Sequence, residues 1–282
     1  MIDMRLRPPL PSWKNSRIFS PATFAAFDHP DYPKPRSCET LALADLITEM
    51  DETGIETGVA MGRQTPTAFG IMPNEELADF AKANSDRFVA WAALDLTQDM
   101  DKILADFNHA VALYDFKGIS IEPTLLDKYS HAGDKRLYPL YEVVQKSRLP
   151  INISLSCALQ AACMQEIDKA RPGHMLLATK DFPELNFHIA HAAWPYTREA
   201  VALAISRKNV WLSPDMYFVP QFPGAEDYFT AAKNYLGDRI LFGSSYPFKP
   251  LKASVDNFRS WGFSKTQFDA ITSENAKRLM RL

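Results

Sequence analysis

Charged and hydroxyl side chains alternate with apolar ones in four short segments of this 282-residue chain. Successive side chains of a β-strand point to opposite faces, so each segment would have one apolar and one polar face. Arginine can hold a carboxylate in a two-pronged fork of hydrogen bonds, and a carboxylate can orient or deprotonate a partner. The polar sets are Asp3, Arg5 and Arg7; Ser120 and Glu122; Asn152, Ser154 and Ser156; and Trp211, Ser213 and Asp215.

The elements that would position these residues repeat along the chain. Short apolar runs alternate with longer stretches of helical period, a pattern typical of βα units around a parallel sheet. Residues 99–111 carry one apolar stripe, and Ser264 with Gln267 predicts a capping box at the start of the last helix. The eight runs are residues 2–6, 57–62, 88–94, 118–122, 151–155, 187–191, 210–213 and 240–244. We expect a single (β/α)8 TIM barrel over residues 1–282.

In a closed barrel the outward faces of the strands pack on helices, so the polar faces must point inward. A purely structural barrel fills its interior with Val, Ile and Leu, and buried charges are costly unless they serve a ligand or one another. The sequence therefore predicts a polar mouth. The alternative is a set of internal ion pairs of Arg5 or Arg7 with Asp3, Glu122 or Asp215, without any chemistry.

Two irregular stretches are rich in aromatic residues. Residues 7–37 form a long Pro-rich loop after the first strand, and residues 214–224 follow the seventh. So much apolar surface is unlikely to stay in water, so we expect the first loop to be ordered and to cover the barrel mouth or a subunit contact. Its aromatic residues are Trp13, Phe19, Phe24, Phe27 and Tyr32.

The composition excludes several classes of protein. A net charge of −3 without a basic stripe argues against a nucleic-acid partner, and no long apolar stretch could span a membrane. Three cysteines without CxxC spacing suggest neither a disulfide framework nor a zinc-thiolate site. The N-terminus lacks the features of a secretory signal, so we expect a cytoplasmic protein, a small-molecule partner and a homo-oligomer.

Several motifs resemble a known family. Residues 2–9, IDMRLRPP, are similar to an I-D-x-H-x-H opening, and residues 240–248, ILFGSSYPF, to an F-G-S-D-x-P strand. These motifs resemble the amidohydrolase-related proteins that include aminocarboxymuconate-semialdehyde decarboxylase, resorcylate decarboxylase and pyrone-dicarboxylate lactonase. Further matches in the same order are GISIEP at 118–123, LYPLYE at 137–142, LPINIS at 149–154, FHIAHAAWP at 187–195 and SENAKRL at 273–279.

The resemblance also shows what this chain has lost. Arg5 and Arg7 stand at the positions of the family's two strand-one histidines, Ser154 at its strand-five histidine and Ser245 at its strand-eight aspartate. Only the strand-six histidine remains, as His191. Guanidinium has no lone pair and would repel a cation, so we expect no bound metal and no other cofactor.

These substitutions lead to a functional hypothesis. Arg5 and Arg7 would hold an anionic group where the relatives hold zinc, in a metal-independent hydrolase of a lactone or ester of a small carboxylated molecule. His191 would act as general acid or base, because an imidazole titrates near neutrality. Asp215 or Glu122 would orient it or activate water. The expected substrate-binding residues are completed by Ser154, Ser245, Tyr246 and Trp194.

Three alternatives remain open. The enzyme could be a non-oxidative decarboxylase, or the barrel could bind a small anion without catalysis. His191 could also be an ordinary hydrogen-bonded core residue, and contact with both a carboxylate and an open pocket would distinguish these cases. His188 has the opposite parity on its strand, so we expect it to face a helix and to be structural.

Overall fold

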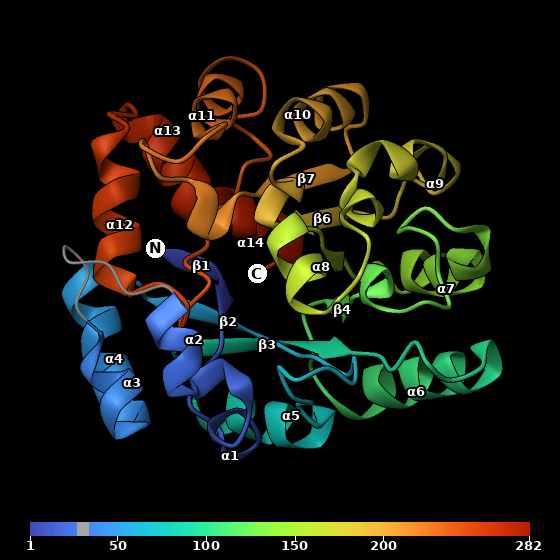
Figure 1. Ribbon diagram of the computed structural model, residues 1–282, viewed down its shortest axis with the longest axis horizontal. Helices are drawn as coiled ribbons and strands as arrows, with labels where there is room; N and C mark the ends of the chain where they lie inside the picture. Colours follow the sequence, from blue (N-terminus) through green and yellow to red (C-terminus); the bar gives the residue numbers. More distant parts are fainter. Residues whose placement is uncertain (27–33) are drawn as a thin grey trace.

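The computed structural model describes residues 1–26 and 34–282. Within these residues, seven parallel strands are hydrogen-bonded in sequence order. Figure 1 shows the strands at the centre of the molecule with helices around them. The strands are β1 (Ile2–Leu6), β2 (Thr57–Met61), β3 (Phe88–Ala93), β4 (Ile119–Ile121), β5 (Ile151–Ser154), β6 (Phe187–Ala190) and β7 (Val210–Ser213). The arrangement is a nearly closed TIM barrel, as the alternation of elements predicted.

The expected eighth strand, residues 240–244, is extended backbone without a full ladder. The N–H of Leu241 donates to the carbonyl of Leu212 (2.9 Å), and the N–H of Met4 donates to the carbonyl of Phe242 (3.0 Å). Isolated parallel bridges join Leu212 to Ile240 and Leu6 to Tyr246. These contacts close the barrel between β7 and β1, although the segment is too short and irregular to count as a strand.

Helices follow each strand in the sequence, with local signals at some of their ends. Asp99 caps α6, and Ser264 and Gln267 form the predicted capping box of α13. The helices of the outer layer are α4 (Leu43–Thr53), α5 (Asn74–Ala83), α6 (Met100–Leu113), α7 (Tyr138–Ser147), α9 (Leu176–Asp181), α10 (Thr197–Ser206), α11 (Ala225–Asn234), α12 (Leu251–Ser260), α13 (Lys265–Asp269) and α14 (Asn275–Met280).

The Pro-rich loop is partly helical. Its described part contains α1 (Pro11–Lys14), the 3-10 turn η1 (Arg17–Phe19), α2 (Pro21–Ala26) and α3 (Arg36–Thr40). Trp13 and Phe19 are buried and Phe24 is half-buried against the same core, so this part of the loop is ordered, as expected, and it covers its own barrel. Phe27 and Tyr32 lie outside the described residues. Within the described ranges, no helix combines the length and apolar character needed to cross a membrane.

Alternation within β1 was predicted incorrectly. The register between β1 and β2 shifts between Asp3 and Leu6, which places one extra residue in β1. Ile2 and Met4 consequently belong to a different apolar cluster from Leu6, although strict alternation puts the three together. The smaller cluster has the parity that faces the barrel interior in β2 and β3, and it contains Ile2, Met4, Val59, Met61, Trp91, Trp211, Leu241, Ala276, Leu279 and Met280.

Candidate active site at the barrel mouth

Three side chains of the candidate site follow strand ends on unusual backbone. His191 (φ 63°), Asp215 (φ 54°) and Ser245 (φ 63°) all adopt the left-handed conformation, which costs a non-glycine residue roughly 1–3 kcal/mol. His191 follows β6 directly, Asp215 lies two residues beyond the end of β7, and Ser245 comes directly after the closing segment. A Cβ at Gly243 would collide with Oδ1 of Asp215, so only glycine fits beside that carboxylate. Strain concentrated at three adjacent strand ends is typical of a functional site.

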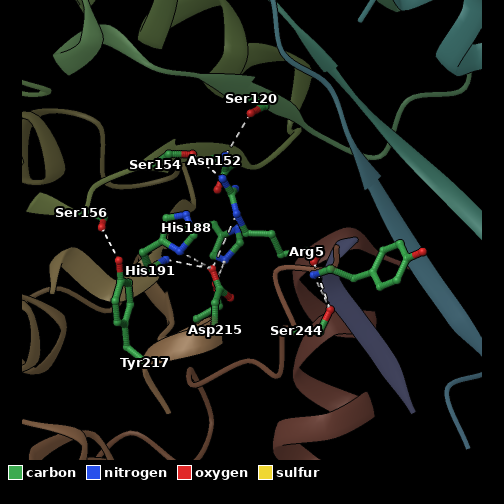
Figure 2. A network of polar contacts seen from close by, with 12 residues as sticks. Arg5, Ser120, Asn152, Ser154, Ser156, His188, His191, Asp215, Tyr217 and Ser244 are labelled. Atoms are coloured by element: carbon green, nitrogen blue, oxygen red, sulfur yellow. Dashed lines mark hydrogen bonds and ion pairs between the residues drawn. The ribbon is translucent and has the colours of Figure 1, made fainter. Parts of the chain in front are cut away.

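Asp215 is the centre of the site (Figure 2). Its Oδ2 accepts the backbone N–H of His191 (2.9 Å) and lies 3.3 Å from Nδ1 of the same residue. The ring is turned so that this second contact is not a well-aligned hydrogen bond. Nε of Arg5 lies 3.7 Å from the same oxygen, and all three side chains are buried. One carboxylate oxygen therefore faces both the imidazole and the guanidinium.

Arg5 connects this centre to hydroxyl groups inside the barrel. Its Nη2 donates to Oγ of Ser154 (3.1 Å), whereas Nη1 has no hydrogen-bond partner in the described part of the chain. Deeper in the same interior, Nδ2 of Asn152 donates to Oγ of Ser120 (3.0 Å). Arg5 thus keeps a donor available although it is almost fully buried.

The expectation that His188 faces a helix is wrong. Its Nε2 lies 2.7 Å from Oγ of Ser213, on the inward face of β7, and its ring contacts Trp91 edge-on with centroids 5.8 Å apart. Burial lowers the pKa of His188 to about 3, so the ring is neutral. His188 and His191 both reach the interior because the left-handed turn at His191 breaks the strand alternation.

Arg63 is a site residue that the sequence reasoning missed. Its Nη2 lies 2.6 Å from Oε1 of Glu122, and both side chains are buried. Oε2 of Glu122 has no partner among the described residues. Arg63 lies two residues beyond Met61, on the inward parity of β2, so extending the alternation of residues 57–62 by one position would have found it. Glu122 therefore pairs with Arg63 rather than with Arg5 or Arg7.

Arg7 is buried without an ion-pair partner in the part of the chain that the structure describes. Its guanidinium lies over the ring of Trp13 at 5.6 Å, and no carboxylate in residues 1–26 and 34–282 lies within ion-pair distance of it. Asp3, the nearest acidic residue in sequence, instead accepts the backbone N–H groups of Arg5 and Ser244, each at 2.9 Å. Glu122 and Asp215 stabilise the charge of Arg7 only from beyond ion-pair distance, and Arg5 and Arg63 oppose it.

Burial and the three arginines shift the titration of the site. Burial raises the pKa of Asp215 to about 6, although the charge of Arg5 opposes this shift. Burial lowers the pKa of His191 well below its ordinary value, and Arg5, Arg7 and Arg63 lower it further. The pKa of Arg7 is also lowered well below its usual range, mainly by burial and to a smaller extent by the charges of Arg5 and Arg63. His191 is therefore a neutral imidazole at neutral pH.

A cavity of about 170 Å³ opens beside His191. α2 and α8 (Cys157–Ala162) contribute to its wall, and the imidazole of His191 forms part of its surface. Oγ of Ser156 and the hydroxyl of Tyr217, 2.6 Å apart, both line it. The cavity is small beside the ~300–1,000 Å³ of most ligand pockets, so it suits a small molecule.

Three other residues were expected to bind the substrate, and their surroundings differ from one another. The hydroxyl of Tyr246 lies 2.6 Å from Oγ of Ser37, so it is engaged away from Asp215 and His191. Trp194 stacks on Tyr217, with centroids 4.9 Å apart, and its Nε1 donates to the carbonyl of Pro223 (2.9 Å), so it supports the cavity wall from behind. Ser245 is buried, with an Oγ that has no partner in the described ranges.

The donor set does not fit the metal that the resemblance implies. Among the described residues, no group of three or more His, Cys, Asp or Glu side chains is arranged to hold an ion. A catalytic zinc site needs about three protein ligands, whereas here Asp215 faces a guanidinium and Glu122 is paired with another. The two strand-one positions that resemble the family's histidines hold Arg5 and Arg7, whose guanidinium groups cannot ligate a cation.

Comparison with known proteins places this geometry in context. An uncharacterised TIM-barrel protein from Bordetella bronchiseptica is 30% identical, with a TM-score of 0.91 over 100% of this chain and 98% of that one. A 2,6-dihydroxybenzoate decarboxylase from Rhizobium is 17% identical (TM-score 0.72, covering 99% and 98%). A dihydroxybenzoic acid decarboxylase from a Polaromonas species, with bound manganese, is also 17% identical (TM-score 0.67, covering 100% and 96%).

The two decarboxylases are so distant in sequence that they establish only the shared fold. A search of curated proteins found no match. The model of the family described as Amidohydrolase, by contrast, matches residues 2–282. The sequence motifs, the barrel and this match agree, and the chain belongs to the amidohydrolase family.

Proposed function

We propose that this protein is a metal-independent hydrolase that cleaves an ester or lactone of a small carboxylated molecule. The observation that carries the proposal is the position of His191, whose imidazole lies 3.3 Å from the Asp215 carboxylate and also lines the cavity. A structural core histidine would be sealed from any ligand. A general base needs a partner that orients it and an open position where it can reach the substrate or water.

Asp215 would orient the imidazole. A hydrogen on Nδ1 facing the carboxylate leaves the lone pair of Nε2 for a water molecule, and the left-handed turn fixes both residues. Catalytic hydrogen bonds are often poorly aligned without substrate and tighten when it binds. The acid–base pair is thus close to a working arrangement.

Hydrolysis then needs no metal. His191 takes a proton from water as the water oxygen attacks the carbonyl carbon, and the free donor of Arg5 stabilises the negative oxygen that forms. The intermediate collapses by breaking the carbon–oxygen bond, and the imidazolium returns the proton to the leaving oxygen. The products are an acid and an alcohol, or one hydroxy acid from a lactone.

The substrate carboxylate would be the counter-ion that Arg7 lacks. Binding it there also activates the base, because the positive charges of Arg5, Arg7 and Arg63 lower the pKa of His191. An anion beside them offsets that effect, so the imidazole becomes more basic when substrate is present. A neutral substrate would give no such activation.

Decarboxylation is less well supported by these residues. That reaction must deliver a proton to carbon, and an imidazole whose pKa is lowered is rarely protonated at neutral pH, so the proton donor is seldom present at the start of the reaction. Guanidinium groups also stabilise the carboxylate of the ground state more than a transition state in which that charge disperses. Both features count against decarboxylation.

The test uses 4-acetoxybenzoate, its neutral methyl ester and a carboxylated lactone. We expect the carboxylated compounds to be hydrolysed, with at least tenfold higher kcat/KM for 4-acetoxybenzoate than for the methyl ester. His191→Gln should lower kcat by ~10²–10⁴-fold. His109→Gln, at an exposed position on α6, is the matched control and should leave kcat unchanged.

Two results would overturn the proposal. Release of carbon dioxide from 4-hydroxybenzoate without hydrolysis of any ester or lactone would indicate a decarboxylase. Binding of benzoate by calorimetry, with no reaction that depends on His191, would indicate a binding protein.

A further inference from the structure

Arg17 lines the same cavity as His191 but belongs to the N-terminal loop, far from the barrel strands in sequence. No motif in the sequence marks it. The cavity wall between the two residues is largely apolar and aromatic, with Phe69, Tyr217 and Phe248 among its lining. A molecule that occupies this cavity therefore meets an imidazole and a guanidinium with apolar surface between them.

The backbone of Arg17 is held in place by two other parts of the chain. Its N–H donates to the carbonyl of Ala68 (3.3 Å), and its carbonyl accepts the hydroxyl of Thr23 (2.5 Å). Its guanidinium lies 5.6 Å from the ring centroid of Phe69. Arg17 is an exposed residue, and contact with the aromatic face restricts its guanidinium, so the group loses less freedom when it binds an anion than an unrestricted side chain does.

The ring of Phe69 contacts two guanidinium groups, those of Arg17 and Arg63, and the two arginines differ in their ion-pair partners. Arg63 lies 5.3 Å from the ring centroid and pairs with Glu122 at 2.6 Å. Arg17 contacts the same ring, yet no carboxylate in the described part of the chain lies within ion-pair distance of it. Of these two arginines, the one without an ion-pair partner among the described residues is the one that lines the cavity.

We propose that Arg17 is a specificity-determining residue that binds a second anionic substituent of the substrate, at the cavity wall contributed by the N-terminal loop. This inference rests on the proposed function, since it concerns the cavity beside His191. The preferred ligand class is then a small molecule with one carboxylate for the buried arginines and another anionic group for Arg17. Guanidinium can grip such a group bidentately.

Calorimetry with benzoate and isophthalate tests the proposal without requiring turnover. The wild-type protein should bind isophthalate at least tenfold more tightly than benzoate. Arg17→Met should remove that preference and leave benzoate affinity within about twofold, whereas Arg17→Lys should retain part of it. Arg259→Met, at an exposed position on α12, is the control and should behave like the wild type.

Equal preference for isophthalate in the wild type and in Arg17→Met would overturn the proposal. So would a loss of benzoate and isophthalate affinity by the same factor, with unchanged thermal stability, because Arg17 would then not act on the second group. Failure of the hydrolase proposal is recognised separately, since it concerns turnover of 4-acetoxybenzoate and its dependence on His191. A selective loss of isophthalate binding supports Arg17 whichever reaction the site performs.

Discussion

The two ends of the barrel interior are built from the same strands, yet they differ in almost every physical property. The end near the strand starts is apolar, and the indole nitrogens of its two tryptophans both have hydrogen-bond partners. Nε1 of Trp91 donates to Sδ of Met280 (3.3 Å), and Nε1 of Trp211 donates to Oδ1 of Asn186 (3.0 Å). At the mouth, buried polar atoms of Arg5, Arg7 and Glu122 have no partner among the described residues.

This contrast separates stability from function within one fold. Unpaired buried polar groups cost free energy, and a chain selected only for stability would fill the mouth as it fills the other end. The unpaired atoms include donors on Arg5, Arg7 and Arg63, and an anionic ligand would satisfy these donors. Substitutions at the two ends should therefore have opposite effects on stability and on binding.

The largest effect on stability is expected at the apolar end. Trp91 is fully buried, so Trp91→Ala should lower the free energy of unfolding by ~3–5 kcal/mol through lost contacts and a cavity. Urea denaturation measures this value. A loss below about 1 kcal/mol would show that the cluster is not a packed core.

Arg7→Met should act in the opposite sense. Removing a buried cation without a counter-ion should leave stability unchanged or raise it by up to about 4 kcal/mol, since burial already disfavours the charged form. Affinity for benzoate should fall by about a hundredfold, the loss of a charge-assisted bidentate contact. Denaturation and calorimetry on the same sample test both parts. Undiminished benzoate binding would contradict the role of Arg7 as the carboxylate receptor.

The pH dependence of kcat/KM sharpens the role of Asp215. Its pKa is raised to about 6, so the carboxylate that orients His191 is present above that pH and protonated below it. We expect kcat/KM to fall about tenfold per pH unit below pH ~6. The pKa of His191 is lowered, so its own protonation lies further into the acid range. An unchanged acidic limb in Asp215→Asn would assign the titration to another group.

The smallest effect is expected at Ser245. Its buried Oγ has no partner in the described ranges, so Ser245→Ala should not lower stability, because it removes an unpaired buried hydroxyl. If Ser245 donates to the ligand, benzoate affinity should fall by about fivefold, the value of one neutral hydrogen bond. Unchanged affinity would remove Ser245 from the site.

The sequence predicted the interior well where the strands are regular. Glu122 and Ser154 point inward as alternation requires, because β4 and β5 have no irregularity. Alternation failed for Met4, because a register shift in β1 adds a residue, and for His188, because the turn after β6 brings both histidines inside. Periodicity carries no information about either feature.

Other parts of the site depend on contacts that no local pattern records. Arg63 was within reach of the pattern, one residue beyond the predicted run. The pairing of Glu122 with Arg63 instead of Arg7 follows from the side-chain arrangement in three dimensions. The contact of Arg17 with Phe69 does so too. Arg17 belongs to a loop, and its position beside the cavity depends on how that loop folds over the mouth.

The central claim is that arginines have replaced the metal of this family with a receptor for an anion. Elemental analysis of the protein, purified without chelator, tests it most directly. We expect no stoichiometric zinc, iron or manganese, because a like-charge pair at ~4 Å costs about 4 kcal/mol at an effective dielectric of ~20, and a divalent ion would face more than one guanidinium. Nearly one equivalent of a transition metal, lost on His191→Gln, would contradict the claim and restore metal-assisted hydrolysis.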